Sequence, residues 1–268
     1  MLQRLVSFPY QLSIIVLFPL LSVAWGIGCY FASRLSGSEH RAHRYMVYFA
    51  KMSLRLARLQ TKVSGLERLD LNITYVFMPN HSSFLDILLV FAAVPHNFRF
   101  IVKEEFFSIP LLGLTVQSSG QIPLDRKHPR KGLQSLKRAA DRLRQGISVV
   151  VFPEGTRSRD GKVQEFKTTL FVLPIRTRTP VVPVLIEGAF EALRRGSVLL
   201  KRGPMKVTFL EPIPADAFSD RDRALYAETV RQSLVGACQK PIHETKVAKE
   251  DKNERALRGA ASRFFGVF

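Results

Sequence analysis

From about residue 62 onward, short apolar runs rich in β-branched and aromatic residues alternate with longer stretches of helical periodicity. The apolar runs predict strands at Thr74–Met78, Phe98–Val102, Ser119–Pro123, Ser148–Phe152, Val181–Ile186 and Lys206–Leu210. The periodic stretches predict helices at Leu85–Ala93, Pro129–Gln145 and Phe218–Val235. Strands separated by helices of this length are typical of an α/β domain with a largely parallel central sheet flanked by helices.

The length of the chain limits how many such domains can form. With 268 residues it is long enough for one sizeable α/β core with an appendage, and short for two full domains. We therefore expect an N-terminal anchoring segment and amphipathic helix at 1–60, one α/β domain at 61–240, and a basic, flexible tail at 241–268.

An uncharged apolar stretch lies near the N-terminus. No charged residue occurs between Arg4 and Arg34, and Leu12–Ala32 has the roughly 20 residues that cross a bilayer. A signal peptide is the competing interpretation, but the stretch is longer than a usual signal-peptide core and no small-x-small cleavage motif follows it. We expect a helix that anchors the protein in the inner membrane, and the cations after it place the rest of the chain in the cytoplasm.

The segment that follows, His40–Gln60, has the pattern of a basic amphipathic helix. Its apolar positions are Tyr45, Phe49, Met52, Leu56 and Leu59, and its cations on another side are Lys51, Arg55 and Arg58. Two placements fit this pattern. The helix could lie on the membrane surface, or it could pack on the α/β domain with its basic face in solvent.

The charge of the chain is strongly positive and narrows the choice of partners. Forty Lys and Arg against 22 Asp and Glu give a net charge of +18, which attracts nucleic acid, anionic lipid, or an acidic carrier or cofactor. Nucleic-acid binding is disfavoured because no basic-aromatic module is present. Cys29 and Cys238 are far apart and lack ligand spacing, so neither a disulfide framework nor a zinc site is indicated.

A polar block, Met78–Asp86 (MPNHSSFLD), separates the first predicted strand from the first predicted helix. If His81 lies in the turn before the helix, its ring can fold back toward Asp86, and the carboxylate would orient the imidazole as a general base. Metal ligation and a structural His–Asp pair are the alternatives, although no cluster of further ligands accompanies the pair. No Ser or Cys lies in a nucleophile-elbow context, so the histidine would act directly on a substrate hydroxyl.

A second polar block, in Val149–Lys167, also follows a predicted strand. In it Gly155 permits close backbone approach, Thr156 and the amides supply donors, Arg157 offers a planar fork suited to phosphate, and Glu154 could accept from a substrate hydroxyl. A charged surface loop is the alternative. Two further cations, Lys103 and the Arg126 that ends Gln121–Arg126, also follow strands. Together these strand ends indicate one site for an anionic substrate.

The two blocks resemble motifs of a known family. Asn80–Asp86 is similar to the N-H-x4-D block of the glycerolipid acyltransferase superfamily, and Phe152–Ser158 to its F-P-E-G-T-R-S block. Ile122–Arg126 resembles the intervening block and Val182–Val184 the fourth. Four blocks in the family order point to the 1-acyl-sn-glycerol-3-phosphate acyltransferases, membrane enzymes of phospholipid biosynthesis, and make 61–240 the catalytic domain.

The resemblance implies transfer of an acyl group from acyl-CoA or acyl carrier protein to lysophosphatidic acid, giving phosphatidic acid, without a cofactor or metal. It implies that His81 is the base and Asp86 its partner. The residues expected at the substrate are Lys103, Arg126, Glu154, Gly155, Thr156, Arg157 and Pro183. The chain departs from the family after Lys167, where Thr168, Thr169 and Leu170 replace a glycine and small residues. An alternative is therefore a same-fold enzyme for another lysolipid, such as a lyso-ornithine lipid or a lysophospholipid in remodelling.

Overall fold

The computed structural model describes residues 16, 20–35, 37–110, 112–125, 128–197 and 199–239. Met1–Val235 forms one compact unit and Gly236–Phe268 a second. Of the second unit, the described residues are 236–239, which end helix α8 (Arg223–Gln239). The predicted tail at 241–268 lies outside the described residues.

Within the described residues, the first unit is built on a sheet of seven strands in the order β1-β7-β6-β2-β5-β3-β4. The strands are β1 (Gln60–Ser64), β2 (Val76–Pro79), β3 (Phe98–Lys103), β4 (Ile122–Leu124), β5 (Ser148–Val150), β6 (Val181–Glu187) and β7 (Pro204–Phe209). All neighbouring pairs are parallel except β6 and β7, which are antiparallel. The prediction of a largely parallel sheet is confirmed.

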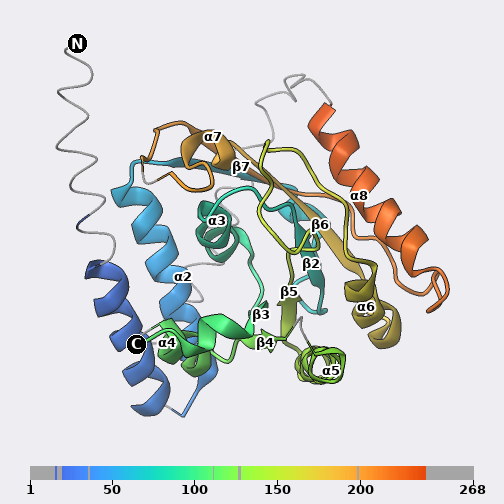
Figure 1. The fold of residues 1–268 in the computed structure, drawn as a ribbon, viewed down its shortest axis with the longest axis horizontal. Coiled ribbons are helices and arrows are strands. Elements are labelled where there is room, and N and C mark those ends of the chain that lie inside the picture. The colour runs from blue at the N-terminus through green and yellow to red at the C-terminus, as the bar shows by residue number, and fades with distance from the viewer. Residues whose placement is uncertain are drawn as a thin grey trace. The chain divides into compact units, whose positions relative to one another are not determined.

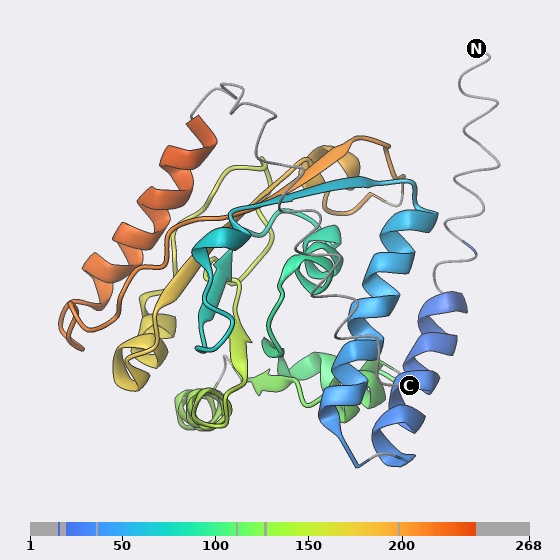
Figure 2. The same ribbon diagram turned by 180° about the vertical axis from the view of Figure 1, so that it is seen from behind.

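Helices cover both faces of this sheet (Figure 1 and, from behind, Figure 2). They are α2 (Glu39–Leu56), α3 (Leu85–Ala93), α4 (Leu112–Ser118), α5 (Pro129–Arg144), α6 (Val172–Thr177), α7 (Ala189–Ala192) and α8, joined by the short 3-10 turns Leu66–Arg68, Glu104–Ser108 and Thr168–Phe171. Helix α3 packs between α2 and the sheet, and α5 packs against β3, β4 and β5. The predicted helix Leu85–Ala93 has the observed bounds of α3.

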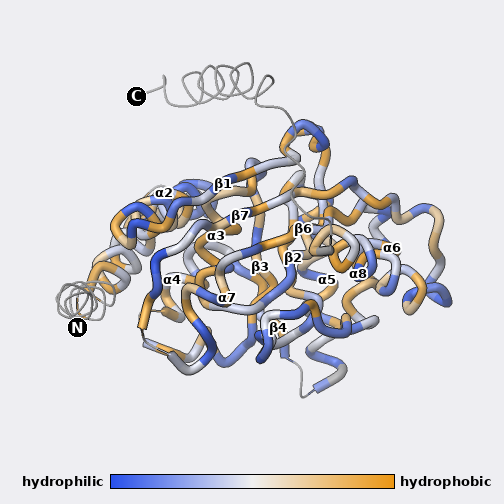
Figure 3. The backbone as a smooth tube through the Cα atoms, turned by 90° about the horizontal axis from the view of Figure 1, so that it is seen from above, coloured by the Kyte–Doolittle hydropathy of each residue, from blue (hydrophilic) through white to orange (hydrophobic). Residues whose placement is uncertain are grey.

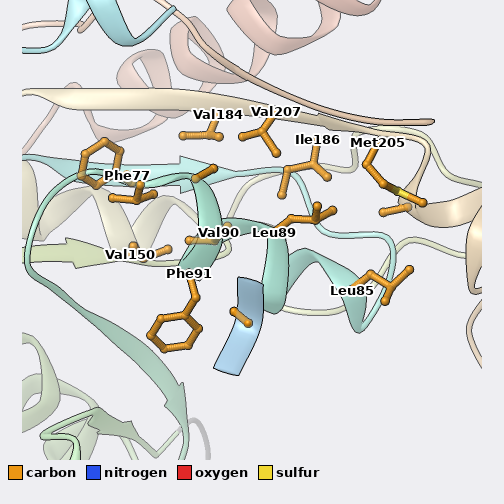
Figure 4. Packing of buried hydrophobic residues seen from close by; sticks show 14 of the residues in the cluster. Phe77, Leu85, Leu89, Val90, Phe91, Val150, Val184, Ile186, Met205 and Val207 are labelled. Atoms are coloured by element: carbon orange, nitrogen blue, oxygen red, sulfur yellow. The ribbon is translucent and has the colours of Figure 1, made fainter. Parts of the chain in front are cut away.

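The core is apolar on both sides of the sheet because successive strand residues point to opposite faces. Leu89 of α3 is fully buried and belongs to one cluster with Phe77, Val184 and Val207 of three neighbouring strands (Figure 4). Met78, which alternates with Phe77 along β2, is also fully buried but lies outside that cluster. The residue order of β2 thus supplies apolar side chains to both faces, and its polar continuation begins at the strand's carboxyl end.

The predicted amphipathic helix at His40–Gln60 forms as α2, which ends at Leu56, whereas Gln60 begins β1. Hydrophilic and hydrophobic segments alternate along α2 in Figure 3. Its buried residues pack against α3, so part of this helix rests on the α/β domain. Lys51, Arg55 and Arg58 are exposed as expected, but so are Tyr45 and Leu56. Tyr45 and Leu56 therefore do not pack on the domain, because the packed face is set by contact with α3.

The membrane anchor predicted at Leu12–Ala32 falls in part outside the described residues. Residues 20–35 are helical. Among the helices in the described parts of the chain, none combines the length and the apolar character needed to span a bilayer.

Two further element boundaries differ from the prediction for local reasons. The strand expected at Ser119–Pro123 is confined to β4, because α4 ends with Ser118 and Ser119 donates its hydroxyl to the Thr115 carbonyl. The helix expected from Phe218 begins at Arg223 as α8. Before it, Asp222 accepts from the main-chain N–H and the hydroxyl of Ser219, which closes a turn that a helix would break.

Candidate active site

The turn between β2 and α3 brings His81 and Asp86 together. Nδ1 of His81 lies 2.9 Å from Oδ2 of Asp86, in the first turn of α3. The same oxygen accepts from the main-chain N–H groups of Ser82 and Ser83 at 2.7 and 2.8 Å. Oδ2 of Asp86 thus accepts from two main-chain N–H groups and lies within hydrogen-bonding distance of the imidazole. The contact between His81 and Asp86 that the spacing predicted is therefore confirmed.

The surroundings of His81 fix the direction of its ring. Asp86 is fully buried, whereas the side chain of His81 is 14% exposed. The imidazole stacks on the ring of Phe152 with centroids 3.9 Å apart. Because an ionised Asp86 can only accept, it selects the tautomer with the proton on Nδ1, which leaves Nε2 with a free lone pair. The arrangement can therefore take a proton from a hydroxyl presented to Nε2.

Glu154, after β5, is bonded to the main chain of His81. Its Oε1 accepts from the His81 N–H at 2.9 Å, and the residue is only 3% exposed. Burial raises the pKa of this carboxyl to about 8, although the N–H groups of His81 and Gln164 act in the opposite direction. The neighbouring strands β2 and β5 thus present His81 and Glu154 at the same edge of the sheet. In this structure Glu154 supports the backbone beside the imidazole.

The chain after Glu154 forms a tight loop on the other side of His81. Gly155 has a φ of 74°, a left-handed conformation that favours glycine. Ser158 donates its N–H to the His81 carbonyl at 2.8 Å, so this loop is bonded to both ends of the His81 residue. Thr156, between them, is exposed. The two polar blocks found in the sequence therefore form one structural unit.

Arg157 lies over an exposed aromatic ring at the same place. Its guanidinium carbon is 3.8 Å from the ring centroid of Phe84, which is 54% exposed. Burial lowers the pKa of Arg157, as does the charge of Arg195, while the charge of Asp86 raises it. A guanidinium that packs over a ring can still donate hydrogen bonds to an anion.

The remaining predicted site residues are placed differently. Lys103 is exposed at the carboxyl end of β3, and Arg126 lies outside the described residues. Pro183 is buried in β6 beside Met78 of β2. There Val182 and Pro183 lie opposite three residues, Leu210–Pro212, between the pairs Val181–Ile213 and Val184–Phe209. The strand with the extra residue is the bulged one, so the β-bulge lies in Leu210–Pro212 and Pro183 lies opposite it.

Sequence reasoning did not single out Phe84, Phe152 and Arg195 as parts of the site. Phe84 and Phe152 stand inside or beside the polar blocks, so an aromatic residue flanked by polar ones was the available signal. Arg195 follows α7, and nothing in the sequence connects it to Arg157. In the described residues no group of three His, Cys, Asp or Glu side chains is arranged to hold a metal ion.

Comparison with known proteins places this geometry in a family. The family model described as Acyltransferase matches residues 60–187, which include both polar blocks. The chain is 36% identical over 176 residues to a chloroplastic 1-acyl-sn-glycerol-3-phosphate acyltransferase of Brassica napus, covering 64% of this chain and 51% of that protein. It is 36% identical over 173 residues to a chloroplastic one of Arabidopsis thaliana, covering 63% and 48%. The chain spans about half the length of these two curated relatives.

A solved structure agrees over nearly the whole fold. The crystal structure of the 1-acyl-sn-glycerophosphate acyltransferase PlsC of Thermotoga maritima matches with a TM-score of 0.73 and 25% identity. The match covers 90% of this chain and 99% of that one. With its His–Asp pair and its loop at neighbouring strand ends, the chain contains an acyltransferase-family domain at residues 60–187 and is similar to 1-acyl-sn-glycerol-3-phosphate acyltransferases.

Proposed function

We propose that this protein transfers a fatty acyl group to the sn-2 hydroxyl of 1-acyl-sn-glycerol 3-phosphate and so forms phosphatidic acid. The observation that carries the proposal is the contact of 2.9 Å between His81 Nδ1 and the buried Asp86. The names of the relatives support the choice of acceptor. The acyl donor would be acyl-CoA or acyl carrier protein, a co-substrate, and the reaction needs no cofactor.

The chemistry follows from the tautomer that Asp86 selects. Nε2 of His81 removes the proton from the acceptor hydroxyl as its oxygen attacks the thioester carbonyl carbon. The tetrahedral intermediate then expels the thiolate, and the proton on Nε2 passes to that sulfur. An ester bond forms, a thioester bond breaks, and the imidazole is restored. Asp86 stabilises the imidazolium between these steps without taking its proton.

The cations and donors beside His81 would hold the acceptor. We assign the phosphate of the lysolipid to Arg157, with the Gly155 N–H, Thr156, Lys103 and Arg126 as further contacts. Glu154 would contribute through the His81 backbone, to which it is bonded. Pro183 would contribute through the shape of the sheet beside β2.

The choice of lysolipid has a second candidate. The chain departs from the family pattern at Thr168–Leu170, and here these residues form part of the 3-10 turn Thr168–Phe171 with Leu170 and Phe171 buried. This segment packs into the fold, so an acceptor contact made there by other members would be replaced. The alternative is the same reaction on a lyso-ornithine lipid or on another lysophospholipid.

We further propose that the protein works at the cytoplasmic face of the inner membrane. Its proposed organisation is an anchor at Leu12–Ala32 within 1–60, a catalytic domain at 61–240 and a basic tail at 241–268. The supporting observations are the uncharged N-terminal stretch and the net charge of +18, which attracts anionic lipid, the substrate phosphate, and an acidic acyl donor.

One assay tests the reaction and the acceptor together. Purified protein would be offered labelled acyl-CoA and acyl carrier protein with a panel of lysophosphatidate, lysophosphatidylglycerol, lysophosphatidylethanolamine and a lyso-ornithine lipid. We expect the highest kcat/KM with lysophosphatidate and a product that comigrates with phosphatidic acid. A preference for the lyso-ornithine lipid would select the second candidate, and no transfer to any acceptor would reject acyl transfer.

A further inference from the structure

A second arginine stands beside the one assigned to the phosphate. Nη1 of Arg195 lies 3.5 Å from the main-chain oxygen of Arg157, although the two residues are 38 positions apart. The charge of Arg195 also contributes to lowering the pKa of Arg157, as expected for two cations that lie close together. Among the side chains that the structure describes, no carboxylate forms an ion pair with either of them.

The loop that carries Arg195 is held at its base. Ser83, which is fully buried, donates its hydroxyl to the carbonyl of Leu193 at 2.8 Å. Lys201 donates its N–H to the carbonyl of Ala192 at 2.8 Å and closes the loop. Because Ser83 also donates its N–H to Asp86, the loop with Arg195 is connected to the turn that bears His81. The position of Arg195 is therefore coupled to the site.

Two nearby cations that are not ion-paired with a carboxylate repel each other and are stabilised by a bound anion. Arg157 already packs over the ring of Phe84. A phosphomonoester carries a charge of about −1.5 to −2 near pH 7 and three terminal oxygens. A phosphodiester has one charge and two such oxygens. Two cations therefore match the charge of a phosphomonoester better than that of a phosphodiester.

We propose that Arg195 and Arg157 together bind the phosphomonoester of the acceptor lysolipid, and that Arg195 makes the site prefer a phosphomonoester over a phosphodiester headgroup. The inference rests on the proposed acyl transfer to a lysolipid and specifies its substrate class. Arg195 is a specificity residue, since it is placed at the headgroup and not at the reacting hydroxyl.

The test compares Arg195→Ala with Arg194→Ala. Arg194 is the adjacent residue, and its guanidinium lies over the Phe190 ring at 5.4 Å, so the control removes the same charge from the same loop. For each purified protein, kcat and KM would be measured with lysophosphatidate and with lysophosphatidylglycerol, a phosphodiester, and KM would be measured for the acyl donor. Thermal melting would verify that each variant is folded.

We expect Arg195→Ala to raise the KM for lysophosphatidate about tenfold, the lower end for a lost charge-assisted contact, with kcat nearly unchanged. The KM for lysophosphatidylglycerol should change less, so the ratio of kcat/KM between the two acceptors falls. Arg194→Ala should leave that ratio unchanged. An unchanged ratio in Arg195→Ala, an equal effect of Arg194→Ala, or a rise in KM for the donor alone would overturn the inference. Wild-type protein inactive on lysophosphatidate would reject the proposed function itself.

Discussion

At the scale of the residue, His81 is the group on which the proposed reaction depends. Replacing it by Ala removes the proton acceptor, so His81→Ala should lower kcat by about 10² to 10⁴. The measurement is steady-state acyl transfer by purified protein. His40→Ala, at an exposed position in α2, is the matched control and should retain activity. Near-normal turnover by the folded His81 variant would exclude it as the base.

Glu154 should make the stability of the protein depend on pH. Its pKa is raised by burial from an ordinary 4.5 to about 8, so the folded state holds its proton more tightly than the unfolded chain does. This contribution to stability is complete below the pKa that Glu154 has in the unfolded chain, and it is lost as the pH rises toward 8. The free energy of unfolding should therefore fall by up to about 1.4 kcal/mol for each pH unit in that window.

Glu154→Gln should remove the fall in the free energy of unfolding with pH, because the glutamine amide does not ionise in this pH range. Urea unfolding of wild type and variant at intervals from about pH 5 to 8 measures the two slopes. Glu228→Gln is the control, since the pKa of Glu228 is lowered to about 2 by its bonds to Arg231 and Gln232 and lies outside the window. Equal slopes in wild type and Glu154→Gln would contradict the prediction.

The sequence predicted one contact within a short segment and indicated that distant strand ends form one site, but it did not give the individual bonds between distant residues. His81 and Asp86 are five positions apart and a strand-to-helix turn was evident, so their contact could be predicted. The bond from Glu154 to the His81 N–H spans 73 positions, and that from Arg195 to Arg157 spans 38. Which atoms of these loops form bonds depends on the strand order and on packing, and local patterns do not specify either.

At the scale of the element, one acidic residue joins α2 to the sheet and to α5. Oε2 of Glu39 lies 2.8 Å from Nη2 of Arg142 in α5 and 3.8 Å from Nη2 of Arg99 in β3. Arg99 is 1% exposed, and its burial lowers its pKa to about 10 while Glu39 acts to raise it. Glu39 therefore neutralises a charge that the sheet has buried.

Glu39→Gln should lower the free energy of unfolding by about 1 to 3 kcal/mol, because the guanidinium of Arg99 would lose its counter-charge. Asp141→Asn is the matched acid-to-amide control. Asp141 pairs with Arg144 on an exposed part of α5, and removing that pair should change the free energy by about 0.5 kcal/mol or less. Urea unfolding of both variants gives the comparison, and equal small effects would show that Glu39 does not stabilise Arg99.

Elements with an apolar pattern were predictable, and those without one were not. The helix at Leu85–Ala93 and the central strands are rich in buried apolar residues and were located to within a few positions. Strand β1 is Gln-Thr-Lys-Val-Ser and is nowhere fully buried, so it has no apolar signal. It is a strand because β7 provides its partners. Tertiary pairing determines its conformation.

At the scale of the whole molecule, the proposed membrane orientation can be tested by protease access. The cations Arg34, Arg41 and Arg44 after the uncharged N-terminal stretch should keep the body of the protein in the cytoplasm. A reporter fused after Phe268 should therefore resist protease added outside intact cells and be digested once the inner membrane is permeabilised. Digestion in intact cells would reverse the orientation, and recovery of the protein in the soluble fraction without detergent would argue against the anchor.

The pairing of β1 with β7 has a consequence for how the protein is made. The hydroxyls of Ser64 and Thr208 are 3.1 Å apart across these strands and 144 positions apart in the chain. A ribosome that adds 5 to 20 residues each second needs about 7 to 30 s to synthesise that interval. During this time β1 has emerged without its partner strand. The nascent chain thus has an incomplete sheet edge throughout most of its synthesis, and chaperones have that interval in which to act.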